Sequence, residues 1–270
     1  MVIPCIDMKI ILIGAGNLAT RLAVALQKKG MTPAYIYSRT RESAEQLSER
    51  LRDVPCSTDI SRVLSLIHIF AVKDSALLDL VSRMPANRGL WVHTAGSMDM
   101  EVFAPYTARY GVFYPMQTFS KERETDFDDI PIFVEANHTN DTERLQELAG
   151  RLSTKVYEAT SEQRKYLHLA AVFACNFTNH LYALCDRILS EHGLPFETML
   201  PLIRETAAKV ADMPPAQAQT GPAIRYDKNV IDKQMALLSD PIMRQIYDLM
   251  SRSIHALALR NEAERKETND

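Results

Sequence analysis

The chain has 270 residues, of which 46% are hydrophobic and 24% are charged, and its formal net charge is −3. This composition is typical of a folded globular protein and argues against wholesale disorder. Since the body of the chain has no basic block, we expect no large nucleic-acid surface. Its apolar runs, such as residues 169–175, are far shorter than the ~20 residues of a membrane span, and the first ten residues show no secretory signal pattern.

The cysteines and histidines indicate neither disulfides nor a metal site. Cys5, Cys56, Cys175 and Cys185 form no CxxC pair and no zinc-site spacing, and the seven histidines show no HxxxH or HExxH pattern. The chain also lacks the GxSxG nucleophile motif and the Walker phosphate-binding motif. Free thiols are typical of a reducing compartment, so we expect a cytoplasmic protein without a bound metal.

The first half of the chain alternates short apolar runs with amphipathic stretches. The apolar runs are rich in β-branched and aromatic residues and predict strands at residues 9–13, 34–37, 66–72, 90–94, 111–114 and 132–135. Helical periodicity predicts helices at residues 18–29, 41–50, 75–83 and 141–152. Strands that alternate with helices in this way are typical of βαβ units, so we expect an α/β fold with a parallel sheet.

The second half of the chain is predicted to be helical. Residues 161–191 predict one long helix or two, and further helices are expected at 197–211, with an interruption at Pro201, at 229–238 and at 241–262. Residues 213–227 form a long irregular loop, which is more often functional than idle, and residues 262–270 are expected to fray. We therefore predict two domains, an α/β domain at residues 1–157 and an all-helical domain at residues 158–270.

A glycine-rich turn follows the first predicted strand. Residues 9–19 read KIILIGAGNLA, in which Gly14-x-Gly16-x-x-Ala19 stands between a strand and a helix. Gly14 permits the tight turn, Gly16 lets the backbone approach a pyrophosphate, and the helix N-terminus presents free N–H groups to the phosphates. The pattern predicts a Rossmann-type doubly wound sheet with a dinucleotide site formed by Gly14, Ala15, Gly16, Asn17 and Leu18. The alternative is an ordinary tight turn that binds no ligand.

The end of the second predicted strand indicates which dinucleotide is bound. A site that prefers NAD usually has an acidic residue here, whereas this chain has Ser38, Arg39, Thr40 and Arg41. Hydroxyl and guanidinium groups suit a 2′-phosphate, so we expect NADP rather than NAD. Both arginines could instead begin a solvated helix, and the sequence does not decide which of the two would contact the phosphate.

Two more loops are expected beside the cofactor, because ligands bind at the carboxyl ends of parallel strands. Ala71, Val72 and Lys73 follow the strand at 66–72 and are expected to lie near the adenosine and pyrophosphate. Thr94 and Ala95 follow the strand at 90–94 and are expected nearer the nicotinamide. Within the latter strand, His93 is as compatible with a buried structural histidine as with a functional one.

Polar residues in an apolar helical stretch suggest the chemistry. At 100° per residue, His168, Val172, Cys175, Asn176 and Asn179 share one side of a helix. Because the pKa of an unperturbed imidazole is about 6.5, His168 is a residue type that could donate a proton while hydride is transferred, and Asn176 could bind substrate or nicotinamide. The alternative is a structural polar network. Side chains expected to contact the substrate lie in three loops: Ser97, Tyr114, Gln117, Thr118 and Arg225. An ion pair with Asp227 is the alternative for Arg225.

Several of these segments together carry a resemblance to a known family. The strings GAGNLA, YSRT, AVKDSAL, HTAGS, YPMQTFS, HLAAVFACNF and TGPAIRYD resemble the Rossmann-like proteins with a C-terminal domain of unknown function of the 2520 type. That family resembles the wider group of pyrroline-5-carboxylate reductase, ketopantoate reductase, 6-phosphogluconate dehydrogenase and deazaflavin-dependent NADP reductase. The resemblance implies a Rossmann domain, a helical domain that often builds a homodimer, and a substrate in the cleft between them.

The chain departs from the β-hydroxyacid dehydrogenase branch of that group. The branch has a catalytic Lys four residues before an Asn, whereas Val172 stands four residues before Asn176 here. We expect an NADP(H)-dependent oxidoreductase that acts on a small C=O or C=N substrate and forms a homodimer through its helical domain, with no nucleic-acid or membrane partner. Two alternatives stay open, a non-catalytic NADP(H) sensor and a deazaflavin-dependent NADP reductase.

Overall fold

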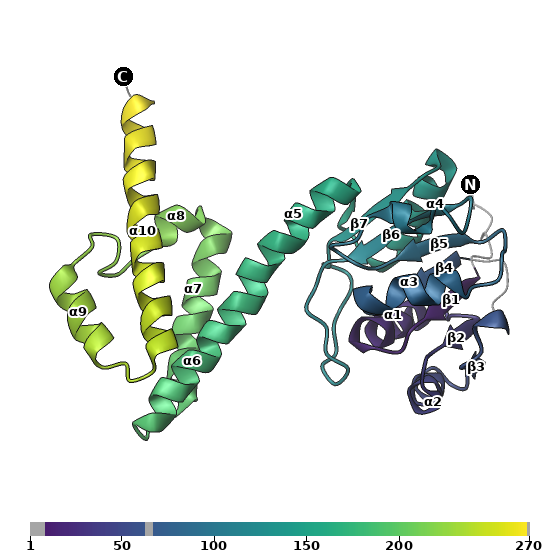
Figure 1. The fold of residues 1–270 in the computed structure, drawn as a ribbon, viewed down its shortest axis with the longest axis horizontal. Helices are drawn as coiled ribbons and strands as arrows, with labels where there is room; N and C mark the ends of the chain where they lie inside the picture. Colours follow the sequence, from purple (N-terminus) through teal and green to yellow (C-terminus); the bar gives the residue numbers. More distant parts are fainter. Residues whose placement is uncertain (1–8, 63–66, 269–270) are drawn as a thin grey trace. The chain divides into compact units, whose positions relative to one another are not determined.

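The computed structural model describes residues 9–62 and 67–268. The chain divides into two compact units, Met1–Asn176 and Phe177–Asp270 (Figure 1). Cys5, the residues before Met8 and the first residue of the strand expected at 66–72 lie outside the described residues. The other cysteines, Cys56, Cys175 and Cys185, are free thiols.

The first unit is built on one sheet, to which the described residues contribute eight strands in the order β3-β2-β1-β4-β5-β6-β7-β8. Their bounds are β1 (Ile10–Ile13), β2 (Tyr35–Tyr37), β3 (Cys56–Ser57), β4 (Ile67–Phe70), β5 (Leu90–His93), β6 (Tyr110–Pro115), β7 (Ile132–Ala136) and β8 (Val156–Glu158). Every pair is parallel except β6 and β7, which are antiparallel. The α/β fold with a mainly parallel sheet is confirmed.

Three features of the sheet differ from the sequence-based expectation. β3 and β8 were not expected, because strands of two and three residues are too short to show a period. β7 is antiparallel to β6, since residues 116–131 between them contain no helix and a parallel return needs a longer crossover, usually helical.

Helices cover both faces of the sheet. Ile10 and Leu12 of β1 pack in a cluster with residues of α1 (Asn17–Lys28), α2 (Arg41–Arg50) and α4 (Thr139–Leu152). Ile11 and Ile13 face the opposite way and pack with α3 (Asp74–Ser82) and the 3₁₀ turn η2 (Met100–Phe103). Successive strand side chains point to opposite faces, so this division confirms a doubly wound sheet buried on both sides.

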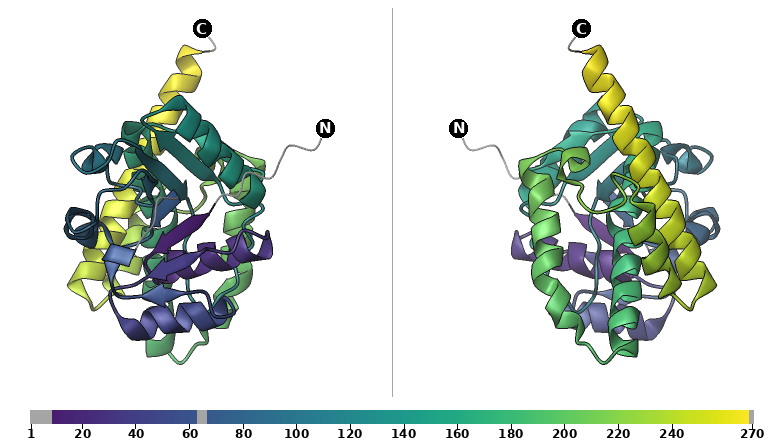
Figure 2. Two further views of the ribbon diagram at one scale, coloured as in Figure 1. Left: turned by 90° about the vertical axis from the view of Figure 1, so that its right-hand side faces the viewer. Right: turned by 90° about the vertical axis from the view of Figure 1, so that its left-hand side faces the viewer.

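The helical part of the chain begins with α5 (Ser161–Ala171), which belongs to the first unit. The π-helical segment η3 (Val172–Phe177) follows it, and the next helices are α6 (Thr178–Glu191), η4 (Phe196–Met199), α7 (Leu200–Asp212), α8 (Pro215–Ala218), α9 (Lys228–Ala236) and α10 (Pro241–Glu267). In the second unit α8 and α9 both contact α10, and Figure 2 shows α10 as its longest helix.

The helical part corrects two expectations. Pro201 does not interrupt a helix, because it lies in the first turn of α7, where proline costs no hydrogen bond. The expected frayed tail is helical as far as Glu267, where Arg265 and Lys266 in the last turn favour the negative end of the helix dipole.

The second unit exposes many large apolar side chains. They include Leu237 (81% exposed), Ile242, Leu249 and Leu257, while a pocket of about 610 Å³ between α6, α9 and α10 is lined mainly by apolar groups. This apolar surface does not amount to a bilayer span, because no helix in the described part of the chain is both long and apolar enough to cross a membrane.

Candidate functional site

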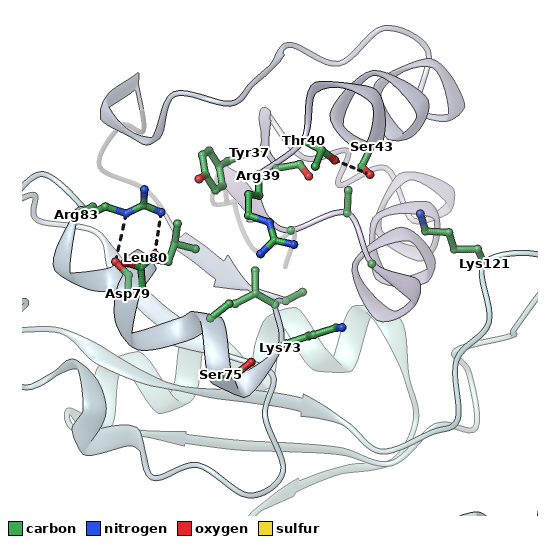
Figure 3. A pocket seen from close by; sticks show the side chains of 17 residues that line it. Tyr37, Arg39, Thr40, Ser43, Lys73, Ser75, Asp79, Leu80, Arg83 and Lys121 are labelled. Atoms are coloured by element: carbon green, nitrogen blue, oxygen red, sulfur yellow. Dashed lines mark hydrogen bonds and ion pairs between the residues drawn. The ribbon is translucent and has the colours of Figure 1, made fainter.

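A pocket of about 580 Å³ lies where β1, β2 and β4 end (Figure 3). Nine of the thirteen expected cofactor-binding residues line it: Gly14, Ala15, Gly16, Ser38, Arg39, Thr40, Ala71, Val72 and Lys73. The structure thus brings together three segments that are up to 59 residues apart in the chain, at the edge where parallel α/β sheets bind ligands.

Gly14 and Gly16 shape the turn between β1 and α1. Gly14 has a φ of +123°, its N–H donates to the Tyr37 carbonyl at 2.7 Å, and a Cβ there would lie 2.3 Å from the Ala71 oxygen. Any side chain at Gly14 would therefore push the β4–α3 loop away. At Gly16 no atom lies within 4 Å of an added Cβ, so the backbone faces open space, as close approach of a pyrophosphate requires.

The N-terminus of α1 is suited to a phosphate. No side chain caps it and no acidic residue lies in its first turn, so its free N–H groups and positive dipole end remain available to an anion. Asn17, the exposed first residue of α1, and Leu18, which packs partly on the core, do not line the pocket.

The segment after β2 separates the roles of the two arginines. The Arg39 guanidinium points into the pocket (Figure 3). Arg41 instead donates through Nε to the Glu45 carboxylate at 2.7 Å on the surface of α2, and this pairing raises the pKa of Arg41. Of the two arginines, Arg39 lines the pocket, whereas the i,i+4 spacing of α2 gives Arg41 its own carboxylate.

Several further side chains add charge or hydroxyl groups to this pocket, among them those of Ser43, Asp79, Arg83 and Lys121. Ser43 accepts a hydrogen bond from the Thr40 hydroxyl at 2.9 Å, Arg83 pairs with Asp79 at 3.1 Å, and Lys121 enters from the opposite side in the view of Figure 3. Sequence reasoning missed all of them. Ser43, Asp79 and Arg83 lie one to three helical turns from expected residues and could have been found from helix periodicity, whereas nothing local marks Lys121.

A second group of side chains gathers near the ends of β5 and β6. The Tyr114 hydroxyl lies 3.3 Å from His168 Nδ1, and the two rings meet edge to face with centroids 6.4 Å apart. A Cβ on Gly96, in the loop after β5, would lie 2.6 Å from the same Nδ1, so only glycine leaves room for this ring position. Burial raises the pKa of Tyr114, which keeps its hydroxyl protonated.

A buried arginine that sequence reasoning missed organises this group. The side chain of Arg164 on α5 is fully buried and donates to the Ala95 carbonyl at 3.2 Å, the Met98 carbonyl at 2.5 Å and the Glu135 carboxylate at 2.8 Å. The guanidinium of Arg164, which is four residues before His168, therefore connects α5 to the loop after β5 and to β7. A buried charge needs such a set of partners, and they come from segments distant in the chain.

The loop after β5 is held by its own residues as well. Ala95 N–H donates to His93 Nδ1 at 3.2 Å, and His93 Nε2 donates to the Asp99 carbonyl at 3.3 Å, which assigns a neutral Nε2–H tautomer. Burial, reinforced by the Arg164 charge, lowers the pKa of His93 to about 4. Thr94 bonds the Phe70 carbonyl, and the Ser97 hydroxyl donates to Asp74, while neither Thr94 nor Ala95 lines the pocket.

Three expected residues of the first unit lie outside both groups. Gln117 and Thr118 are exposed and bond each other, and Asn176 is exposed at the end of η3. The expected shared face of His168 and Asn176 assumed α-helical spacing; residues 172–177 are π-helical and turn less per residue, and the shared face stays a prediction. Arg225 is exposed in the second unit, and within the described residues it forms no ion pair with Asp227, whose side chain caps α9.

The comparisons with known proteins agree with this architecture. Residues 3–76 match the model of shikimate / quinate 5-dehydrogenase, and residues 130–254 match a domain of unknown function (DUF2520). The chain is 52% identical to BF3122 from Bacteroides fragilis, which is designated an NADP oxidoreductase, over 93% of this chain and 98% of that one, with a TM-score of 0.86.

Two more distant structures share the fold. Protein TM1727 from Thermotoga maritima is 22% identical over 92% of this chain and 99% of its own, with a TM-score of 0.77. A reductive aminase from Aspergillus terreus, solved with NADPH and ethyl levulinate, is 16% identical over 92% and 94% of the two chains, with a TM-score of 0.70. No curated protein matches the chain. With its glycine turn, its cationic pocket and its match to BF3122 over nearly the whole of both chains, the protein belongs to the family of Rossmann-fold NADP oxidoreductases that carry a C-terminal DUF2520 domain.

Proposed function

We propose that this NADP oxidoreductase transfers a hydride between NADP(H) and the C=O or C=N bond of a small substrate. The observation that carries the proposal is the Tyr114–His168 pair, which lies at the same carboxyl edge of the sheet as the cationic pocket. A pocket for the dinucleotide and a proton donor at one edge are the two parts that a carbonyl or imine reduction requires.

The pocket residues fit NADP(H). The uncapped N-terminus of α1 and the open space at Gly16 suit the pyrophosphate, and Arg39 with the Thr40 and Ser43 hydroxyls suits the 2′-phosphate. When bound, NADPH supplies the hydride. Thr94, Ala95, Asn17 and Leu18 do not line this pocket and stay predicted contacts, with Thr94 and Ala95 toward the nicotinamide.

His168 is the proton donor in this proposal. Tyr114 stays protonated. When the His168 ring is neutral, the tyrosine hydroxyl donates to Nδ1, and the proton of the ring is on Nε2. When the ring is charged, Nδ1–H donates to the tyrosine oxygen instead. In either state Tyr114 fixes the ring, and Gly96 provides the space for it. The charged ring would then protonate, through its free Nε2–H, the alkoxide or amine nitrogen that forms as the hydride arrives, and would be left neutral with its remaining proton on Nδ1.

Two pairs of variants test the proposal. Arg39→Ala should weaken NADPH binding by roughly 10- to 100-fold with little effect on NADH, because a charge-assisted bond to the 2′-phosphate is lost, and Arg41→Ala should change neither. His168→Ala should lower turnover by roughly 100-fold or more while the NADPH dissociation constant stays within twofold. Loss of NADPH absorbance with a panel of keto acids and cyclic imines gives turnover, and NADPH fluorescence gives binding.

Three results would count against the proposal. Equal losses of affinity for NADPH and NADH in Arg39→Ala would contradict the assignment of Arg39 to the 2′-phosphate. Full activity of His168→Ala would remove His168 from the reaction. Tight NADPH binding by the wild-type protein without turnover of any substrate in the panel would favour the non-catalytic sensor.

We also propose that the second unit forms a homodimer. Exposed Ile242, Leu249 and Leu257 lie within about 80° of one another around α10, and Leu237 is 81% exposed. Exposed apolar side chains on one side of a helix are typical of an interface between subunits. Ser97, Gln117, Thr118, Asn176 and Arg225 stay candidate substrate contacts, with Arg225 suited to a carboxylate.

A further inference from the structure

The connection between β6 and β7 is much longer than its ends require. β6 and β7 are antiparallel neighbours, and such strands are commonly joined by two to five residues, yet residues 116–131 lie between them. Figure 1 shows this segment, the β6–β7 loop, extending away from the edge of the sheet toward α1. Loops of this length without secondary structure in a compact domain are usually functional or disordered.

The β6–β7 loop is held in place by basic side chains from α1 and α2. Arg21 of α1 is only 6% exposed, and it donates through Nε to the Ser120 carbonyl at 2.8 Å and through Nη2 to the Lys121 carbonyl. Arg50 of α2 donates to the same Lys121 carbonyl at 3.0 Å. Because a buried guanidinium must find acceptors, Arg21 holds the backbone of this loop in one position.

The second half of the loop is anchored to the core. Phe127 is 2% exposed and stacks on Phe119 with ring centroids 5.6 Å apart, and the Asp128 carboxylate accepts from Lys29 at 2.7 Å. The loop is thus anchored on both sides of residues 122–126 by contacts within the first unit.

These contacts place the side chain of Lys121 at the phosphate side of the pocket. Lys121 lines the main pocket together with the Gly14–Gly16 turn, and with Ala15 and Ser43 it also lines a neighbouring pocket. Figure 3 shows its chain extending from the loop toward the pocket. Two other cations nearby already have carboxylates, Arg41 with Glu45 and Arg83 with Asp79, whereas within residues 9–62 and 67–268 no ion pair involves Lys121.

We propose that Lys121 binds a phosphate group of NADP(H), and that Arg21 and Arg50 hold the β6–β7 loop so that its ammonium group can do so. The proposal rests on NADP(H) being the cofactor. An ammonium group held between the start of α1 and the start of α2 is between the two places where that cofactor carries phosphate, namely the pyrophosphate at the glycine turn and the 2′-phosphate at Arg39 to Ser43.

The test compares two variants of one loop. Lys121→Met removes the charge but keeps the length of the side chain, and Arg123→Met removes a charge from an exposed neighbour that lines neither pocket. Full-length proteins are titrated with NADPH and with NADH by fluorescence, at low and high salt. We expect Lys121→Met to weaken NADPH binding by about tenfold and Arg123→Met to change it by less than twofold. Lys121→Arg should recover most of the affinity.

Comparing the affinities for NADPH and NADH identifies which phosphate group Lys121 binds. A loss confined to NADPH assigns Lys121 to the 2′-phosphate, and an equal loss for NADPH and NADH assigns it to the pyrophosphate. NADPH affinity of Lys121→Met equal to that of Arg123→Met would overturn the inference and leave the proposed function intact. Wild-type protein that binds neither cofactor would overturn the proposed function, and this inference with it.

Discussion

The two units differ in how completely they bury their apolar side chains. The central strands β1, β4, β5 and β6 of the first unit are entirely buried, and its core contains residues such as Trp91, Phe113 and Leu145 with no exposed surface. In the second unit Ile231 and Met243 are the buried large apolar residues among those described, while Leu237, Ile242 and Leu249 are more than 60% exposed. The first unit therefore has the core of an independent domain, whereas the second buries few of its large apolar side chains, as the proposed homodimer would require.

The same contrast applies to chemistry. The glycine turn, Arg39, Lys121 and the Tyr114–His168 pair all belong to the first unit, and Arg225 is the one expected site residue in the second. A rigid, well-buried sheet is the better scaffold for groups that must be placed accurately, because side chains there are fixed by packing. The exposed helices suit assembly better than catalysis.

The largest effect is expected from the buried arginine of the first unit. Arg164→Met should destabilise the first unit by about 3–5 kcal/mol, because it leaves the Glu135 carboxylate and two carbonyls without their buried partner. Lys165→Met is the matched control, since Lys165 is half-exposed and pairs with Asp99 at 3.7 Å, and it should cost less than about 1 kcal/mol. Urea unfolding followed by Trp91 fluorescence measures both. Equal losses of unfolding free energy in the two variants would contradict the proposed role of the Arg164 network.

The next effect concerns the apolar face of the second unit. Leu249→Glu should raise the dimer dissociation constant by roughly 100-fold or more, because a two-fold interface would bury the new charge twice. Leu78→Glu is the control from the first unit, where Leu78 on α3 is 51% exposed compared with 62% for Leu249. Sedimentation velocity over a concentration series measures the assembly state. A monomeric wild-type protein, or dissociation by both variants, would contradict the contrast between the units.

The smallest effect depends on pH and tests burial in the first unit. The pKa of His93 is about 4 in the folded protein, below the ordinary 6.5, so the unfolded chain binds a proton that the folded protein does not. The stability contributed by neutral His93 is complete above pH 6.5 and is lost as the pH falls toward 4, by about 2 kcal/mol at pH 5. His93→Gln should lack this part of the pH dependence. Urea unfolding of both proteins at pH 7 and pH 5 checks it, and identical pH dependences would contradict the burial of His93.

Sequence reasoning succeeded where the signal is local. The strand, the turn at Gly14 and Gly16 and the start of α1 occupy ten consecutive residues, and Arg39 follows directly on β2, so period and turn chemistry alone predict the pocket. α2 was predicted at its observed bounds for the same reason. The short strands β3 and β8 and the π-helical segment η3 were not predicted. Two or three residues are too few to show a period, and a π-helix has a different period from an α-helix.

The amino-acid sequence by itself determined the Rossmann architecture, the glycine turn, and Arg39 and Lys73 as basic side chains of the pocket, since each signal lies within one strand–turn–helix unit. Only the tertiary structure decided which distant groups meet. Tyr114 and His168 are 54 residues apart, Arg21 and Lys121 are 100 residues apart, and Arg164 reaches back 69 residues to Ala95. Such contacts are set by how strands order in the sheet and by where buried charges find acceptors, and no local period encodes either.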